Sequence, residues 1–429
     1  MNIGIYVLVL LFVLLLSSTP VSVSIGFSSF VYLLITNVNL QTVPQRMFTT
    51  VDVSTLFAVP LFLLAGSLMN TTGITNRIFR LANVLVGHIT GGLAHVNVLA
   101  SAIFASMSGS SVADAAGLGV IEIKAMTDAG YDKDFSCAIT LASCTISPII
   151  PPSIIMVIYG VAASVSIGRL FIAGIVPGFI MALSLMIMNF FIAKKHNYPV
   201  MPRASFREVK KAFFDALLPL GTPFIIVGGI IGGVFTATEA AAVTVAYTLI
   251  LDILIYRELT FKKFKDIALE VGITSAVILF LVATTGILGW VLARERIPVQ
   301  IMQFFLDLTD NPILIMLIIN ILLLIMGCFI DATPIVLLMV PILMPLLQKI
   351  SFDPVLFGVV ISINTMIGLT TPPVGVSLYA VSAISGVPMQ RIVRKIIPYW
   401  LALILCLFVI TYIPGLTLTL PNLVFGMAR

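Results

Sequence analysis

Hydroxyl-bearing residues and a glycine gather in one short stretch of an apolar segment. The stretch contains Ser106, Ser108, Gly109, Ser110 and Ser111. Hard cations prefer oxygen ligands, a rule stated for Ca²⁺ and Mg²⁺ that extends to Na⁺. Small polar residues also let membrane helices pack closely. Two interpretations therefore stay open for this stretch, a sodium site and a packing surface.

Two prolines further along the chain free additional oxygen atoms. Pro151-Pro152 interrupts an apolar run, and a proline in a helix leaves a carbonyl about one turn earlier without its partner. We expect Ser143, Ser147 and the carbonyls of residues 149–152 to face the hydroxyl-rich stretch. The predicted ligands of this first sodium site are Ser106, Gly109, Ser110, Ser143, Ser147, Ile149 and Pro151.

Asp331 is a charged residue inside an apolar run. Such a carboxylate usually faces a cavity, an ion or a basic partner. It can also cap the helix predicted to start near Thr333; a functional role is preferred, and the two roles are compatible. The predicted ligands of a second sodium site are Asp331, Thr333, Asn364, Thr370 and Thr371, so at least two ions are expected.

Arg294 closes another apolar run. Its guanidinium can bind a substrate carboxylate through two hydrogen bonds, or it can mark the edge of the membrane. Glu239 opens a helix of small residues, where a carboxylate is expected to act as a cap. No residue is given a catalytic role. The predicted substrate-binding residues are Ser108, Ser110, Arg294 and Asp331.

The composition places these residues in a membrane protein. Of the 429 residues, 60% are hydrophobic and only 10% are charged, and the mean hydropathy is +1.17. The apolar runs are long enough to cross a bilayer as helices of about 20 residues. The net charge of +5 comes mostly from loops, which indicates membrane orientation rather than a nucleic-acid partner. No GxxxxGK[ST] motif is present, so an ion gradient is the expected energy source.

The chain also contains an internal repeat. Residues 110–183 recur without a gap as residues 331–404. Matched prolines within apolar segments are typical of the discontinuous helices of transporter binding sites. A re-entrant hairpin, tipped near 106–111 or 327–333, is predicted before each broken helix, and the four breaks should converge on one polar cavity. The aligned landmarks are Pro151-Pro152 with Pro372-Pro373, Pro177 with Pro398, and Asp132 with Asp353.

The loop charges predict that the two copies run in opposite directions. Basic clusters at 194–211 and 257–265 should both lie in the cytoplasm, so two crossings with a turn near Gly232-Gly233 must join them. The first copy ends by entering a basic cluster, whereas the second begins its last helix after Arg391, Arg394 and Lys395. The prediction is an all-α polytopic membrane protein with inverted-topology repeats.

Four segments are predicted from this pattern. Residues 71–86 and 292–307 should form amphipathic connectors, one at the start of each repeat, that lie at the membrane interface and hinge a moving part. The segments are an N-terminal scaffold helix region (1–50), repeat one (51–193), basic loops with a scaffold helix pair (194–266) and repeat two with the last helix (267–429).

Several dispersed motifs, in the same order, give the chain a family resemblance. The motifs are Pro60-Leu61-Phe62-Leu63-Leu64-Ala65-Gly66, Ser108-Gly109-Ser110-Ser111, residues 149–153, residues 170–178 and Thr238-Glu239-Ala240-Ala241-Ala242. The chain resembles, over essentially its whole length, the large membrane subunit of TRAP (tripartite ATP-independent periplasmic) transporters. Ala237 departs from the proline that this family usually has before Thr-Glu.

The resemblance implies a multi-pass protein of the bacterial inner membrane that imports an organic acid with Na⁺ by an elevator movement. It also implies two partners, a separate small four-helix membrane subunit and a periplasmic substrate-binding protein. Family substrates include C4-dicarboxylates, sialic acid and other sugar acids, and sialic acid is preferred here. The alternatives are a stand-alone sodium/carboxylate symporter of a related inverted-repeat fold and a channel-like or scaffolding membrane subunit.

Overall fold

The computed structural model describes residues 3–17, 19–71 and 73–426, so the predicted segments 1–50, 51–193, 71–86 and 267–429 each include at least one residue outside these ranges. The described residues form helices without strands. Six helices are long and apolar enough to cross a membrane, or seven if the bent pair Thr42–Val51 and Ser54–Asn70 counts as one span. The predicted polytopic α-helical class is confirmed.

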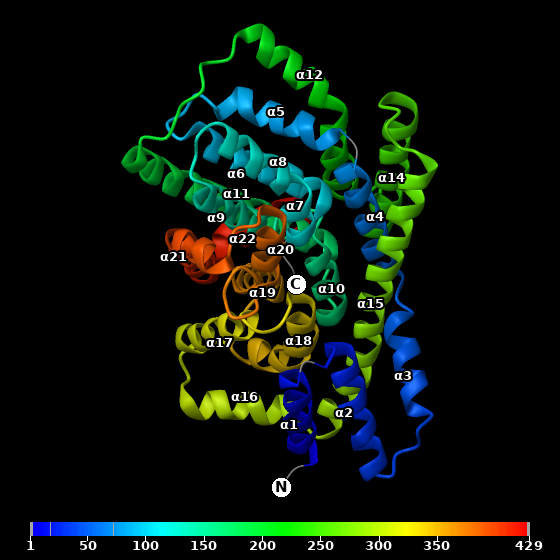
Figure 1. The fold of residues 1–429 in the computed structure, drawn as a ribbon. Coiled ribbons are helices and arrows are strands. Elements are labelled where there is room, and N and C mark those ends of the chain that lie inside the picture. Colours follow the sequence, from blue (N-terminus) through cyan, green and yellow to red (C-terminus); the bar gives the residue numbers. More distant parts are fainter. Residues whose placement is uncertain (1–2, 18, 72, 427–429) are drawn as a thin grey trace.

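One group of helices lies outside the two repeats. Its long helix α15 (Phe261–Arg294) packs against α2, α3 and α4, while α14 packs against α4. Figure 1 shows these helices along one flank of the molecule. Together with α15, the elements of this α15 group are α1 (Ile3–Leu16), α2 (Val21–Ile35), α3 (Thr42–Val51), η1 (Ser54–Phe57), α4 (Ala58–Thr71), α12 (Phe206–Pro223), η3 (Phe224–Gly228), α13 (Gly229–Ile231), α14 (Ala237–Ile250) and η4 (Leu251–Ile255).

The two repeats supply the other helices. Repeat one contains α5 (Ile74–Val86), α6 (Gly92–Ser108), α7 (Ser111–Ala116), α8 (Leu118–Asp128), α9 (Lys133–Ser143), η2 (Cys144–Ile146), α10 (Ile154–Ala163) and α11 (Ile167–His196). Repeat two contains α16 (Ile297–Leu308), α17 (Pro312–Gly327), α18 (Ala332–Lys349), α19 (Pro354–Leu369), α20 (Val376–Ser385) and α21 (Met389–Tyr412), followed by α22 (Pro414–Phe425).

The duplicated landmarks occupy equivalent places in the two repeats. Asp132 caps α9 by accepting a hydrogen bond from the Asp134 N–H, and Asp353 caps α19 by accepting from Val355 and Leu356. In each repeat the capped helix stops before a cis Pro-Pro bond, and a second helix follows. Each repeat therefore consists of a connector, a helical hairpin, a broken helix and a long final helix.

The opposite orientation of the repeats is visible in the placement of their connectors. Figure 1 shows α5 and α16 at opposite ends of the molecule. The basic clusters 194–211 and 257–265 are joined by two spans, Phe206–Ile231 and Ala237–Ile255, with Gly233 in the turn at φ 66°. This matches the two crossings expected between cytoplasmic loops.

Local sequence rules account for several helix ends. Glu239 and Thr236 form a capping box, in which each side chain accepts a hydrogen bond from the other residue's backbone N–H. Such a box satisfies two N–H groups at a helix start that have no partner within the helix. The predicted capping role of Glu239 is confirmed.

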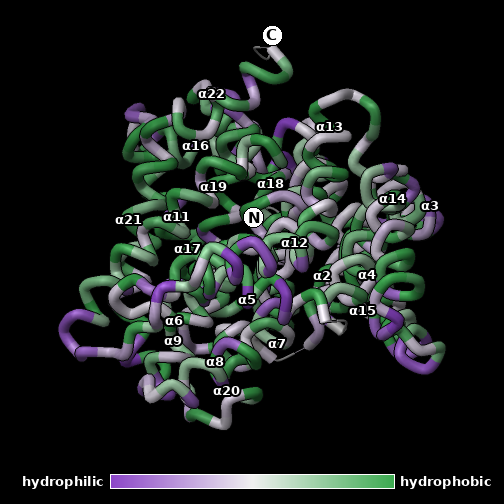
Figure 2. Tube along the Cα trace, turned by 90° about the horizontal axis from the view of Figure 1, so that it is seen from above, coloured by the Kyte–Doolittle hydropathy of each residue, from purple (hydrophilic) through white to green (hydrophobic). Residues whose placement is uncertain are grey.

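The two repeats pack against each other through the second half of each broken helix. Helix α10 of repeat one packs against α18 of repeat two, and α20 of repeat two packs against α7 of repeat one. The Ser111 and Ser377 hydroxyls lie 3.1 Å apart at the second of these contacts. Figure 2 shows hydrophobic residues along most of the trace, as expected for helices that meet lipid and each other. Each hairpin is thus held by the broken helix of the other repeat.

Candidate functional site

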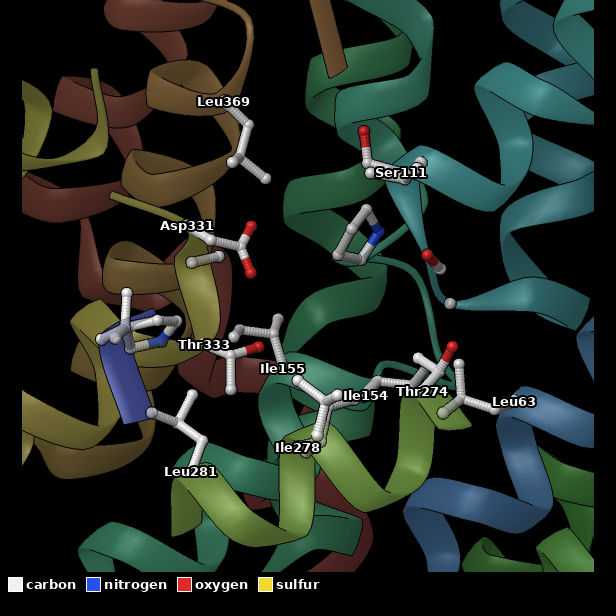
Figure 3. A pocket seen from close by; sticks show the side chains of 18 of the residues that line it. Leu63, Ser111, Ile154, Ile155, Thr274, Ile278, Leu281, Asp331, Thr333 and Leu369 are labelled. Carbon is white, nitrogen blue, oxygen red and sulfur yellow. The ribbon is translucent and has the colours of Figure 1, made fainter. Parts of the chain in front are cut away.

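A cleft of about 520 Å³ lies where the two hairpin tips approach α15. Figure 3 shows Ser111 and Asp331 on opposite sides of the cleft, with the Asp331 carboxylate pointing into it. The tips contribute residues 109–112 and 331–334, the broken helices contribute Pro148, Ile154, Ile155, Met366 and Leu369, and α15 contributes Thr274, Ile278 and Leu281. The second broken helix reaches the cleft only through Met366 and Leu369 of its first half, α19 (Pro354–Leu369), and not through its break. The predicted convergence of four breaks on one cavity is therefore seen only in part.

The prediction of a polar cavity is wrong, because the lining is mostly apolar. Ile154, Ile155, Ile278 and Leu281 line one side of the cleft. Its polar side chains are Ser22, Ser110, Ser111, Thr274, Asp331 and Thr333. A largely apolar pocket with a few placed polar groups is the usual form of a small-molecule site.

Asp114 joins the first tip to the first broken helix. Its carboxylate accepts hydrogen bonds from the Ser108 hydroxyl and from the Ser147 hydroxyl, and its side chain is fully buried. Two predicted site residues are thus brought together by a carboxylate that the sequence reasoning missed. The sequence contained an indication of this role, because Asp114 is an acidic residue inside a short hairpin within the membrane, and such residues usually belong to functional sites.

Ser143 belongs to a second buried hydrogen-bond network, next to this tip. Its hydroxyl donates to the Asn97 side-chain oxygen at 2.7 Å and accepts from Ser101 at 3.0 Å. The Asn97 amide nitrogen donates to the Thr140 hydroxyl at 2.7 Å. These bonds tie the first helix of the hairpin, α6, to the first half of the broken helix, α9.

The other predicted ligands of the first sodium site have separate surroundings. Gly109 and Ser110 line the cleft, whereas the Ser106 hydroxyl donates to the Ile103 carbonyl at 2.6 Å. The Ile149 carbonyl lies against Gly174 of α11, where an added Cβ would approach it to 2.2 Å. Pro151 is buried and does not line the cleft. The structure therefore brings only part of the predicted set together.

In the second repeat, Asp331 and Thr333 line the cleft. Asp331 is the N-terminal capping residue of α18 by backbone position. Its carboxylate interacts with the backbone N–H groups of Ala332 and Thr333 without completing a capping hydrogen bond, and it points into the cleft. The tip contacts the second broken helix through backbone, since the Val374 N–H donates to the Cys328 carbonyl at 3.0 Å.

The remaining residues of the predicted second site bond elsewhere. Asn364 donates to the Asn320 side-chain oxygen at 2.9 Å. Thr370 accepts from the Trp400 indole at 2.9 Å and donates to the Ile367 carbonyl, to which Thr371 also donates. None of the three lines the cleft. Buried hydroxyls in helices commonly bond to a carbonyl three or four residues earlier.

Arg294 is not brought to the cleft. It is exposed in the last turn of α15, and its guanidinium carbon lies 5.3 Å from the centre of the Trp290 ring. The cleft residue of α15 closest to it in sequence is Leu281, about 20 Å away along the helix at 1.5 Å per residue. Its position agrees with the alternative role, a residue at the membrane edge.

A carboxylate secures the start of each connector. Glu258, in the loop after η4, accepts a hydrogen bond at 2.5 Å from the N–H of Gly73, which precedes α5. Glu295, which precedes α16, accepts at 2.5 Å from the hydroxyl of Tyr32 on α2. Both connectors are therefore attached, at their first residues, to helices of the α15 group.

Comparison with known proteins agrees with this architecture. Residues 8–416 match the family model described as "Tripartite ATP-independent periplasmic transporter, DctM component". The chain is 45% identical over 97% of its length to the sialic acid TRAP transporter large permease protein SiaM of Vibrio cholerae, of which 98% is covered. It is 38% identical over 93% of its length to the C4-dicarboxylate TRAP transporter large permease protein DctM of Pseudomonas aeruginosa, of which 94% is covered.

A solved structure shares the fold. The YdaH transporter of Alcanivorax borkumensis, whose crystal structure was described as revealing an unusual topology, aligns with a TM-score of 0.60 at 12% identity. The alignment covers 86% of this chain and 87% of that one. With inverted repeats around one cleft and a family match over nearly its whole length, this chain belongs to the DctM family, the large permease subunits of TRAP transporters in the bacterial inner membrane.

Proposed function

We propose that this protein imports an organic acid, with sialic acid as the first candidate, together with Na⁺. The observation that carries the proposal is the cleft in which both hairpin tips meet, with Asp331 and Ser111 on opposite sides. The name of the V. cholerae relative supports sialic acid, and that of the P. aeruginosa relative supports C4-dicarboxylates as the second candidate. A small four-helix membrane subunit and a periplasmic binding protein complete the proposed system.

The charge of Asp331 supports a requirement for a cation. A carboxylate substrate that enters the cleft meets the carboxylate of Asp331, and like charges at close distance in an apolar site repel strongly. The cleft lining contains no Lys, Arg or His. Sodium ions held by oxygen atoms of the tips would neutralise this repulsion, so that ion and substrate bind together.

The first tip has a geometry suited to ion-dependent ordering. Asp114 links the tip residue Ser108 to Ser147 in the broken helix. Gly109 adopts a left-handed φ of 62° between them, and an added Cβ would approach the Pro152 carbonyl to 2.4 Å. Carbonyl and hydroxyl oxygens from two elements are thereby held close together. We propose that Na⁺ binds among these oxygens and fixes the tip against the broken helix.

The elevator movement is proposed from the attachment of the connectors. The hairpins and broken helices interlock across the two repeats, which favours their movement as one body. Each connector begins at a residue that is bonded to the α15 group, Gly73 or Glu295. The cleft lies between the interlocked body and α15, so sliding of the body along α15 would carry the bound substrate across the membrane.

Uptake into proteoliposomes tests the proposal. Labelled sialic acid or succinate is offered with the small subunit and the cognate binding protein each present or omitted, with and without an inward Na⁺ gradient. Uptake that needs all three components is expected. Uptake without the binding protein would support the stand-alone symporter instead, and uptake indifferent to both the binding protein and Na⁺ would support a channel-like subunit.

Two substitutions test the site itself. Ser110→Ala and Asp331→Asn remove polar groups that line the cleft. Each is expected to reduce Na⁺-driven uptake at least about tenfold, the effect of losing roughly 1.4 kcal/mol of binding. Normal uptake by both correctly inserted variants would contradict the assignment.

A further inference from the structure

A second cavity, of about 210 Å³, lies beside α15 and shares no lining residue with the substrate cleft. Its walls come from α3, η1, α10, α15 and α18, and the described side chains that line it are apolar except for Thr50 and Thr285. Both hydroxyls donate to carbonyls of their own helices, Thr50 to Arg46 at 2.7 Å and Thr285 to Leu281 at 2.8 Å. The lining therefore offers no free hydroxyl proton, and such a cavity suits a hydrocarbon chain rather than a polar substrate.

Two glycines of α15 shape the wall of this cavity. Gly289 borders open space, since an added Cβ there would meet nothing within 4 Å. Gly286 allows α3 to approach, because an added Cβ would overlap the Thr50 hydroxyl. Glycine in the middle of a helix is less stable than alanine. Packing alone explains Gly286, whereas the glycine at 289 leaves space that another molecule can fill.

Two arginines and a tryptophan continue the same pair of helices beyond the cavity. Trp290 follows Gly289 on α15. The guanidinium carbons of Arg46, on α3, and Arg294, on α15, lie 6.0 Å and 5.3 Å from the centre of the Trp ring. Both arginines are exposed, and neither takes part in an ion pair found within the described residues. Arg46 precedes the cavity residue Thr50 by about one helical turn, so this cationic pair, Arg46 and Arg294, lies next to the cavity.

The cationic pair lies at the periplasmic edge of the membrane. Helix α15 starts in the basic cluster 257–265, which the positive-inside rule places in the cytoplasm, and its 34 residues are enough to cross a bilayer. The positive-inside rule gives no reason for arginines at the far end of this helix. Tryptophan is typical of the level of the lipid headgroups, and a guanidinium group binds phosphate through two hydrogen bonds. The pair therefore has the depth and the charge to bind the phosphate of a lipid headgroup.

We propose that this cavity and the cationic pair together bind one anionic phospholipid of the outer leaflet. An acyl chain fills the space beside Gly289, and the headgroup phosphate binds Arg46 and Arg294. An anionic headgroup balances the two guanidinium charges, whereas a zwitterionic headgroup places a positive group of its own beside them. A soluble phosphate ester has no chain to fill the cavity. The inference requires neither the sodium coupling nor the movement proposed above.

Lipid binding to the purified complex with the small subunit tests the site. The complex is delipidated in detergent, phosphatidylglycerol is added, and the bound lipids are counted by native mass spectrometry. Phosphatidylcholine with the same acyl chains tests the role of charge, and glycerol phosphate tests the role of the chain. We expect wild type to bind one phosphatidylglycerol more tightly than phosphatidylcholine by about tenfold or more. Glycerol phosphate should not bind.

Two variants separate the two halves of the site. Gly289→Leu fills the cavity at a position with open space and should bind one phospholipid fewer than wild type, with either headgroup. Arg46→Gln combined with Arg294→Gln should keep the chain in the cavity and lose the preference for phosphatidylglycerol. The arginine changes are at exposed positions, so they test the site even if the leucine variant does not fold.

Matched controls use other positions of α15. Gly272→Leu makes the same change at an exposed glycine where an added Cβ would also meet nothing within 4 Å. Lys262→Gln combined with Lys265→Gln removes two exposed positive charges at the cytoplasmic end of the helix. Both controls should bind phosphatidylglycerol as wild type does.

Three results would overturn the inference. The first is a folded Gly289→Leu variant that binds as many phospholipids as wild type. The second is an arginine double variant that keeps the wild-type preference for phosphatidylglycerol. The third is an arginine double variant that keeps this lipid but loses binding of the periplasmic binding protein, since the pair would then meet an acidic protein surface.

Discussion

The Glu258 side chain holds the backbone of Gly73, accepting its N–H at 2.5 Å. Arg77 lies on the first turn of α5, and its guanidinium nitrogen is 3.7 Å from an oxygen of the same carboxylate. The guanidinium carbon lies 3.8 Å from the centre of the Tyr256 ring. The start of the first connector is therefore fixed to the end of the α14 span. Since both ion-pair side chains are partly exposed, the ion pair contributes little, and the backbone hydrogen bond is the main link.

Substitution of Glu258 tests whether this link governs transport. In Glu258→Ala the Gly73 N–H loses its acceptor, a loss of about 1.5 kcal/mol for a hydrogen bond to a charged group. If the connector moves during transport, the equilibrium between its positions shifts by roughly tenfold. We expect the maximal uptake rate to change several-fold while the substrate KM stays constant, as measured by initial rates in proteoliposomes.

Two control variants make the result specific to the hinge. Glu258→Gln keeps an acceptor for Gly73 and should be milder than Glu258→Ala. Glu270→Ala, at an exposed position of α15, should behave as wild type. A change in KM with a constant maximal rate would instead place Glu258 in substrate binding, against the hinge role.

Gly109 gives a second prediction, about the first hairpin tip. An alanine there must adopt a φ of 62°, and its Cβ would approach the backbone carbonyl of Pro152 to 2.4 Å. Backbone atoms cannot move aside as a flexible side chain can, so the tip must separate from the broken helix. We expect Gly109→Ala to lose most Na⁺-driven uptake and to raise the Na⁺ concentration for half-maximal uptake at least several-fold.

Gly130 supplies the control for this prediction. It also has a positive φ, 89°, but an added Cβ would meet nothing within 4 Å. Gly130→Ala therefore carries only the cost of the left-handed backbone, about 1 kcal/mol, and should transport nearly normally. Equal effects of the two substitutions would show that backbone conformation, and not contact with Pro152, determines the phenotype.

The sequence predicted the architecture because the repeat is marked by residues with strict backbone requirements. Asp132 and Asp353 cap helices, and the two Pro-Pro pairs lie in the non-helical breaks that follow those helices. These rules are local, so they can be applied without the fold. The connectors, the broken helices and the opposite orientation of the repeats followed from them together with loop charges.

The site could be predicted only in part, because side-chain contacts depend on which helix faces meet. Thr370 and Ser106 are the predicted residue types in the predicted places, yet their hydroxyls bond to carbonyls of their own helices. Arg294 belongs to the same helix as the cleft residue Leu281, but it lies several turns away. The role of Asp114 depends on the packing of the tip against the broken helix, which places its carboxylate between Ser108 and Ser147.

A third prediction concerns the contact between Asp134 and Arg391, which joins the two repeats. The Arg391 Nε lies 2.7 Å from the Asp134 carboxylate, whose side chain is 11% exposed. The second carboxylate oxygen is buried without a hydrogen-bond partner, so Arg391 is the main compensation for its charge. We expect Arg391→Ala to destabilise the protein by about 2 kcal/mol, within the range for hydrogen bonds to charged groups, in thermal unfolding in detergent.

A double-mutant cycle separates this pair from the general effect of positive charge. Arg394→Ala, at an exposed residue of the same helix, should change the unfolding temperature little. Asp134→Asn combined with Arg391→Ala should destabilise less than the two single changes added together, because the first change removes the charge that needs compensation. Additive effects would show that the two residues do not act as a pair.

The last prediction uses the neighbouring ion pair, Asp132 with Lys395, whose atoms lie 3.0 Å apart. Partial burial acts to raise the pKa of Asp132, but the Lys395 ammonium and the Asp134 N–H outweigh it and hold the pKa below its ordinary value. A carboxyl group whose pKa is lowered by folding stabilises the protein above its unfolded pKa, about 3.9, and loses that contribution as the pH falls through the folded value.

Both side chains are 38% exposed, so the expected contribution is below about 1 kcal/mol. Unfolding temperatures of wild type and Lys395→Ala should differ slightly at neutral pH and converge near about pH 3; a difference that stays constant down to that pH would contradict an electrostatic origin.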